Sequence, residues 1–191
     1  MSERRAREPD LLDKLDALPR TGYTGRLWRV VREGREPLQP SHIAGRWDMG
    51  VGDALYTSLD PNGAVAEIDF RLRQEPVFPS RFRAVLHELT VELHGVVRFD
   101  TVEDLRPFGV DPDSYHTRLY RRTQEIGDAA QFLAFAALIA PNARWPCLNL
   151  VIYDVEAHNI QVISQKAVDW DAWRAETRVI RRSKGDPHET E

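Results

Sequence analysis

The chain has 191 residues, of which 42% are hydrophobic and 29% charged, and its formal net charge is −4. These values are typical of a single soluble globular domain, and the acidic balance argues against a nucleic-acid-binding protein, which usually presents a basic face. The only cysteine is Cys147, which excludes an intrachain disulfide and favours a reducing compartment. The charged N-terminus lacks the apolar core of a secretory signal, and the longest apolar run, 132–140, is too short to cross a bilayer. We therefore expect a cytoplasmic protein that binds neither nucleic acid nor a membrane directly.

The two ends of the chain are expected to be peripheral. In the segment 1–22, leucines recur at helical spacing after Pro9 and Asp10, which predicts a short amphipathic helix that packs on the domain or on a second subunit. The sequence therefore leaves open whether the chain forms a homo-oligomer. The segment 179–191 has no apolar pattern, and we expect a mobile tail there.

Between these ends, residues 23–178 alternate predicted strands and helices. Asp60 followed by Pro61 is a typical helix start, because the aspartate can cap the first turn and proline fits its first position. The expected strands are 27–31, 54–57, 85–93, 137–140 and 148–153, and the expected helices are 60–73, 123–135 and 169–177. This order predicts an α+β fold with a mixed, mostly antiparallel sheet and flanking helices.

Two arginines are candidate anion-binding residues. Arg29 lies in the apolar strand 27–31, so its charge either points outward or meets an anion in a cleft. Arg46 follows Gly45, and a glycine lets the backbone approach a ligand while a guanidinium grips phosphate or carboxylate in two-pronged fashion. The alternative for Arg46 is a surface residue with a solvated head.

An aromatic residue and a carboxylate follow these arginines. Tyr56 ends a short predicted strand and is either a ligand-stacking ring or a core aromatic whose hydroxyl finds one partner. Glu67 lies among small residues that leave room for a ligand, but it also lies four residues before Arg71, where an exposed ion pair would explain it. An arginine, a tyrosine and a glutamate together can bind a dinucleotide phosphate, stack on a pyridinium ring and stabilise a ribosyl cation.

The familiar motifs of other enzyme classes do not occur. The six histidines show no metal-binding spacing, and Cys147 has no second cysteine with which to share a metal. The glycines form neither a phosphate loop nor a dinucleotide fingerprint, and no Gly-x-Ser-x-Gly elbow occurs. No metal is expected.

The order of several short segments resembles the RES domain family, the toxins of bacterial toxin–antitoxin pairs. The resemblance runs from about Gly25 to Tyr153, and its specificity lies in the ordered set rather than in any one segment. The segments are Leu27-Trp28-Arg29-Val30, Gly45-Arg46-Trp47-Asp48, Leu55-Tyr56-Thr57-Ser58, Ala66-Glu67, Thr123-Gln124-Glu125-Ile126-Gly127-Asp128-Ala129, Leu138-Ile139-Ala140-Pro141-Asn142-Ala143-Arg144 and Asn149-Leu150-Val151-Ile152.

The resemblance implies an ADP-ribosyltransferase-like fold that binds NAD as its substrate in a cleft of the sheet. The two family arginines match Arg29 and Arg46, the family tyrosine matches Tyr56, and the family glutamate matches Glu67. The family serine falls at Asn142, which is a departure because an asparagine is bulkier and lacks the hydroxyl. Its amide can still donate and accept hydrogen bonds, and its alternative is a simple turn residue.

The implied activity is cleavage of the nicotinamide–ribose bond of NAD, by hydrolysis or phosphorolysis. The carboxylate would stabilise an oxocarbenium-like ribose, the two arginines would hold the diphosphate, and the tyrosine would cap the nicotinamide. The implied partner is an Xre-like helix-turn-helix antitoxin that covers the cleft. The alternatives are a RES-like domain without turnover that binds a nucleotide or a partner, an ADP-ribosyltransferase acting on a protein, and an interaction protein without a ligand.

Overall fold

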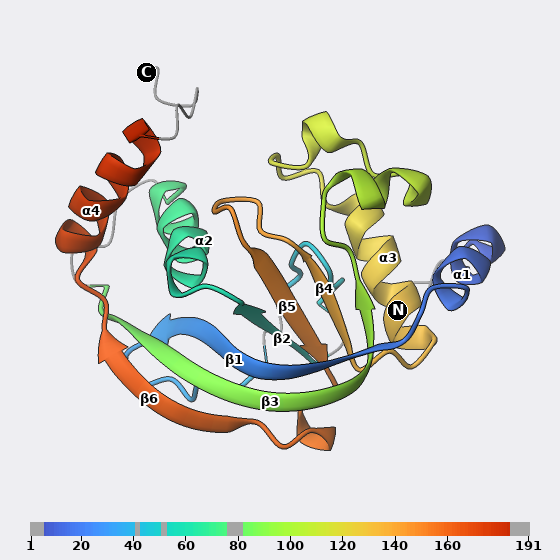
Figure 1. Ribbon diagram of the computed structural model, residues 1–191, viewed down its shortest axis with the longest axis horizontal. Helices are drawn as coiled ribbons and strands as arrows, with labels where there is room; N and C mark the ends of the chain where they lie inside the picture. The colour runs from blue at the N-terminus through green and yellow to red at the C-terminus, as the bar shows by residue number, and fades with distance from the viewer. Residues whose placement is uncertain (1–5, 41–42, 51–52, 76–81, 184–191) are drawn as a thin grey trace.

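The computed structural model describes residues 6–40, 43–50, 53–75 and 82–183, with the backbone alone for 178–183. Its elements follow the order of strands and helices shown in Figure 1. The strands are β1 (Thr21–Arg32), β2 (Ala54–Ser58), β3 (Ala84–Arg98), β4 (Ala137–Pro141), β5 (Leu148–Tyr153) and β6 (Gln161–Ala167). The helices are α1 (Pro9–Asp16), α2 (Pro61–Arg73), α3 (Arg121–Phe132) and α4 (Trp170–Ser183), with short 3-10 turns η1 (Glu103–Phe108), η2 (Pro112–Ser114) and η3 (Val155–Ala157).

The sheet is mixed and mostly antiparallel, as the sequence predicts. Its strand order is β1-β2-β5-β4-β3-β6, and only the β3–β4 pair is parallel among the described strands. An additional antiparallel pairing of β1 with β3 joins the two ends of the first five strands, so that the sheet curls into a barrel-like ring. The fold is therefore α+β, with a closed rather than an open sheet.

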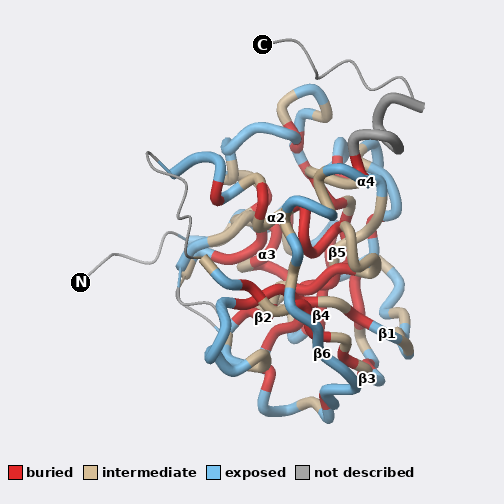
Figure 2. The backbone as a smooth tube through the Cα atoms, turned by 90° about the vertical axis from the view of Figure 1, so that its left-hand side faces the viewer, coloured by how far each residue is buried: buried red, intermediate tan, exposed pale blue. Residues whose placement is uncertain are grey.

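The barrel interior and the two helical flanks form three apolar clusters. Leucines, valines and isoleucines from all five ring strands fill the interior. One further cluster lies under α1, α3 and η1, and another lies between α2 and the residues around α4. Figure 2 shows β4 and β5 as largely buried and β6 as exposed, and β6 is the last strand in the order of the sheet.

Helix α2, which carries Glu67, begins where the sequence predicts. The Asp60 carboxylate accepts hydrogen bonds from the backbone N–H groups of Asn62 and Gly63, at 2.7 and 3.3 Å, and Pro61 occupies the first helical position. This is the capping arrangement expected from the sequence, and it fixes the first turn of the helix against β2. A side chain at Gly63 would collide with Cys147, so the helix lies close to the turn between β4 and β5.

The boundaries of several helices and strands differ from those expected from the sequence. The predicted strand 27–31 begins six residues earlier, at Thr21, and the predicted helix 169–177 continues to Ser183. The sequence analysis does not predict strand β6. The strand Gln161–Ala167 is exposed throughout, and a strand without a buried face need not show alternating apolar and polar residues. Of the expected tail, 184–191 lies outside the described residues. No described helix is both long and apolar enough to span a membrane.

Candidate functional site

The carboxylate of Glu67 lies on α2 and is held by an amide rather than by an arginine. Asn149 on β5 donates a hydrogen bond from Nδ2 to Glu67 Oε1 at 3.4 Å. Within the described part of the chain, Glu67 forms no ion pair, so the pairing with Arg71 that the spacing allows is not made. The side chain is half-buried and keeps its charge uncompensated by direct contact.

Tyr56 on β2 anchors the loop that carries Arg46. Its hydroxyl accepts a hydrogen bond from the Trp47 backbone N–H at 2.9 Å, and Gly45 packs so closely on the ring that any side chain there would collide with it. Burial raises the pKa of Tyr56, and the charge of Asp48 adds to the effect, so the hydroxyl is neutral at physiological pH. Tyr56 therefore places Arg46 whether or not it also touches a ligand.

Arg46 is clamped between two aromatic rings. Its guanidinium carbon lies 4.6 Å from the ring centre of Tyr115 and 4.5 Å from that of Tyr120. One guanidinium nitrogen donates to the Thr117 carbonyl at 3.2 Å. Contact with the faces of aromatic rings still leaves guanidinium N–H groups available for an anion. The alternative of a free surface arginine does not fit this geometry.

Arg29 points into the protein and not outward. The residue is 7% exposed and donates to the carbonyls of Tyr56, at 3.2 Å, and Gln39, at 2.8 Å, while its Nε is buried without a partner among the described residues. Burial lowers the pKa of Arg29 to about 10, and the nearby charges of Arg35 and Arg71 add to this. Arg29 thus braces β2 and brings a buried positive charge behind Tyr56.

Asn142 begins the turn between β4 and β5 and is 6% exposed. Its Oδ1 accepts hydrogen bonds from the backbone N–H groups of Arg144, at 2.7 Å, and Trp145, at 3.0 Å, which is the turn role that asparagine often takes. Its Nδ2 donates to Asn149 Oδ1 at 2.8 Å and to the Gly63 carbonyl at 3.4 Å. Asn142 is thus both a turn residue and a neighbour of the residue that holds Glu67.

The sequence reasoning missed four residues of this site. Asn149 is named above, Tyr115 and Tyr120 clamp Arg46, and Arg144 lies with its guanidinium carbon 3.4 Å from the ring centre of Phe70 on α2. Arg144 also donates to the His116 carbonyl at 2.6 Å. Burial lowers the pKa of Arg144, and the opposing charge of Glu67 partly offsets this. The sequence signal for Arg144 is its place two residues after Asn142, whereas the tyrosines lie in a turn-rich segment without any pattern.

The arginines of the described chain divide into two groups. The arginines in ion pairs with carboxylates are Arg7, Arg20, Arg26, Arg73, Arg83, Arg98, Arg106, Arg121, Arg122 and Arg174. The arginines that form no ion pair among the described residues are Arg29, Arg32, Arg35, Arg46, Arg71, Arg118 and Arg144. Of these, Arg29, Arg46, Arg71 and Arg144 act electrostatically on Tyr56, on Tyr115 or on one another. Arg46 and Arg144 act on one another, and Arg144 also interacts with the charge of Glu67, so two arginines without ion pairs lie close together near this carboxylate, which is the electrostatic setting of an anion site.

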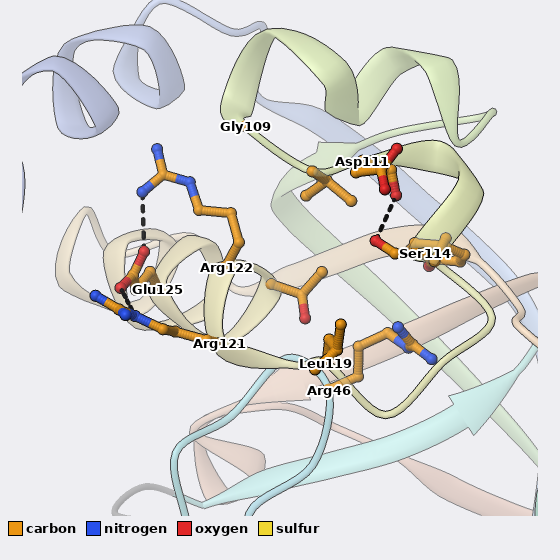
Figure 3. A pocket seen from close by; sticks show the side chains of 11 residues that line it. Arg46, Gly109, Asp111, Ser114, Leu119, Arg121, Arg122 and Glu125 are labelled. Carbon is orange, nitrogen blue, oxygen red and sulfur yellow. Dashed lines mark hydrogen bonds and ion pairs between the residues drawn. The ribbon is translucent and has the colours of Figure 1, made fainter.

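A cavity of about 380 Å³ lies beside Arg46. Figure 3 shows Arg46 on one side of it and the ion pair of Arg122 with Glu125 on the other. Tyr115 also lines it, but Glu67 does not. The cavity and Glu67 are therefore separate features, although the charges of Arg46 and Glu67 both act on Tyr115, which lines the cavity. Within the described ranges, no group of three or more histidine, cysteine, aspartate or glutamate side chains could hold a metal ion.

Comparison with known proteins gives the family. The model of the RES domain matches residues 26–174, and the chain belongs to this family. The solved structures include a chain of the M. tuberculosis MbcT–MbcA toxin–antitoxin complex with a TM-score of 0.75 and 16% sequence identity, covering 88% of this chain and 97% of that one. At this identity the likeness concerns the fold. No curated protein matches the chain.

Proposed function

We propose that this chain is the toxin of a toxin–antitoxin pair and degrades NAD by cleaving its nicotinamide–ribose bond, by hydrolysis or phosphorolysis. Membership of the RES domain family and the fold shared with a chain of a toxin–antitoxin complex support the toxin role. The partner we propose is an Xre-like helix-turn-helix antitoxin that covers the face around Glu67.

The observation that carries the enzymatic part is that Glu67 forms no direct ion pair among the described residues. Its carboxylate is half-buried, accepts a hydrogen bond from Asn149 and has no ion pair in the described structure. Departure of nicotinamide leaves a cationic, oxocarbenium-like ribose, and a carboxylate that no arginine neutralises can stabilise that charge. An ion-paired carboxylate would first have to break its pair.

The arginines supply the opposite half of the site. A dinucleotide carries a diphosphate, and Arg46 offers in-plane N–H groups fixed by its two tyrosines. Arg29 has two of its nitrogens bound to carbonyls, so we assign it mainly a charge that favours the diphosphate from behind β2. Tyr56 holds the Arg46 loop and caps the nicotinamide. No metal takes part in this scheme.

A domain that binds NAD without turnover is the second candidate, and the observation that favours it concerns Asn142. This residue stands where the family has a serine, and its amide oxygen and nitrogen both bond within the protein. A side chain with its hydrogen bonds satisfied internally offers little to a substrate.

Nicotinamide release from NAD by the purified chain, followed together with thermal unfolding in the presence of NAD, tests the proposal. Release in the presence and absence of phosphate, with the product identified as ADP-ribose or its 1-phosphate, supports the enzyme and distinguishes hydrolysis from phosphorolysis. A rise in unfolding temperature without release supports the binding domain. If NAD is not cleaved and the unfolding temperature does not rise, both candidates are contradicted.

A further inference from the structure

A chain of two asparagine amides connects the β4–β5 turn to Glu67. Asn142 Nδ2 donates to Asn149 Oδ1 at 2.8 Å, and Asn149 Nδ2 donates to Glu67 Oε1 at 3.4 Å. The three residues come from the turn, from β5 and from α2, and Asn149 lies 82 positions from Glu67 in the sequence. The amides therefore link α2 to β5 through side chains.

The direction of this chain is set by the turn. The oxygen of Asn142 already accepts from the backbone N–H groups of Arg144 and Trp145, so its NH₂ group must face Asn149. Asn149 then turns its oxygen toward Asn142, which leaves only its own NH₂ group for Glu67. An amide has one donor side and one acceptor side, so fixing one end of such a chain fixes the other.

We propose that Asn149 is a positioning residue that Asn142 orients so that a donor, and never an acceptor, faces the Glu67 carboxylate. This inference rests on the proposed function in so far as Glu67 is the catalytic carboxylate. Asn149 holds that carboxylate in one rotamer before substrate arrives. This arrangement also accounts for an asparagine at position 142, because its side-chain oxygen bonds to the turn and its side-chain nitrogen bonds to Asn149.

Reversal of the chain is the sharpest test. Asn142→Asp keeps the acceptor that the turn needs but has no donor for Asn149, so the Asn149 amide rotates by half a turn and presents its oxygen to Glu67. Asn149→Asp places a carboxylate there directly. For both variants we expect turnover to fall roughly tenfold or more, as when a positioned donor is lost, while calorimetric NAD affinity stays within about twofold. The acid limb of the pH–rate profile moves to higher pH.

Asn62→Asp is the matched control. It adds the same negative charge in the first turn of α2, where Asn62 Oδ1 accepts from the Trp173 indole at 3.0 Å, and an aspartate can keep that bond. We expect parental turnover. The double variant Asn142→Asp/Asn149→Ala separates rotation from simple charge, because without the Asn149 amide the charge added at position 142 has no amide to reverse, and the Asn142→Asp effect largely disappears relative to Asn149→Ala alone.

A readout without substrate keeps the inference separate from the proposed function. In the parent, the Asn149 side-chain NH₂ resonances shift when Glu67→Gln is introduced; in Asn142→Asp they do not respond to that change. Loss of this response with no NAD cleavage in any variant would sustain the amide chain and refute the enzyme. Identical Asn149 resonances in the parent and Asn142→Asp, in folded protein, or equal turnover in the parent and Asn149→Asp, would overturn the inference.

Discussion

Helix α2 carries two carboxylates only two residues apart, on different faces of the helix, and their surroundings differ. Asp69 is buried and bonds to two arginines, Arg73 at 2.7 Å and Arg174 at 2.8 Å, the second of which ties α4 to α2. Glu67, two residues earlier, lies near arginines but, within the described chain, bonds to none of them, only to the Asn149 amide. A neutralised carboxylate holds elements together, whereas a carboxylate left charged next to cations is available for a ligand. On one helix, Asp69 therefore stabilises the fold, whereas Glu67 belongs to the candidate functional site.

The largest expected effect is on cell growth and cellular NAD when the chain is expressed with and without the Glu67 carboxylate. If Glu67 drives NAD cleavage, the parent should stop growth and remove most cellular NAD, and Glu67→Gln should relieve both because it removes the charge that stabilises the ribosyl cation. Glu103→Gln, at an exposed ion pair with Arg106, is the control and should remain toxic. Growth with normal NAD from abundant folded parent protein would argue for the binding domain.

Asp69→Asn should act on stability instead. Removing a buried charge that bonds two arginines should cost about 2 kcal/mol, since the bonds are charge-assisted but Arg73 is more than half exposed. For a chain of this size that is a fall in unfolding temperature of roughly 4–8 °C. Calorimetric unfolding of Asp69→Asn and Glu67→Gln measures the contrast; a larger loss in Glu67→Gln would reverse the assignment of the two carboxylates.

Arg46→Ala should weaken NAD binding about tenfold, because a contact with the diphosphate acts in the ground state as well as in the transition state. Arg106→Ala, which breaks only an exposed ion pair, is the control. Titration calorimetry decides: equal affinities in the parent and Arg46→Ala would remove the phosphate contact from the account. Arg29→Ala should weaken both binding and stability, since its guanidinium braces two carbonyls.

The smallest expected effect is on the alkylation rate of Cys147, because the charge of Glu67 contributes to the pKa of its thiol. Burial, with added contributions from Asp60 and Glu67, raises the pKa of the Cys147 thiol to about 11. A raised pKa keeps the thiol protonated at about pH 9, so alkylation of the native protein should be roughly tenfold or more slower than in denatured protein. Glu67→Gln should speed native alkylation roughly twofold, whereas Asp69→Asn should not. Equal rates in all three proteins would mean that the Glu67 charge is screened.

Local signals predicted the elements that place Glu67, and non-local contacts escaped prediction. Asp60 and Pro61 mark the start of α2 in sequence because a cap is a contact between near neighbours. The closure of β1 on β3 and the exposed strand β6 depend on distant pairing, and no single segment encodes them. The ordered resemblance to the RES family pointed to Arg29, Arg46, Tyr56, Glu67 and Asn142 together.

The partners of those residues were beyond sequence reasoning. Asn149 contacts Glu67 across 82 positions, and Arg46 is clamped by tyrosines from a distant segment, whose Thr117 carbonyl lies 71 positions further along the chain. Such contacts arise from the fold and leave no periodic trace. The spacing of Glu67 and Arg71 left an ion pair open that the structure does not form, because helical spacing permits a pair without requiring it.

The most direct test of the account compares NAD cleavage by the parent, Glu67→Gln and Asp69→Asn in one assay of nicotinamide release, with each protein shown to be folded by circular dichroism at the assay temperature. The account predicts that Glu67→Gln loses on the order of a hundred- to a thousand-fold in rate, while Asp69→Asn keeps a rate close to that of the parent. A parental rate from folded Glu67→Gln would contradict it.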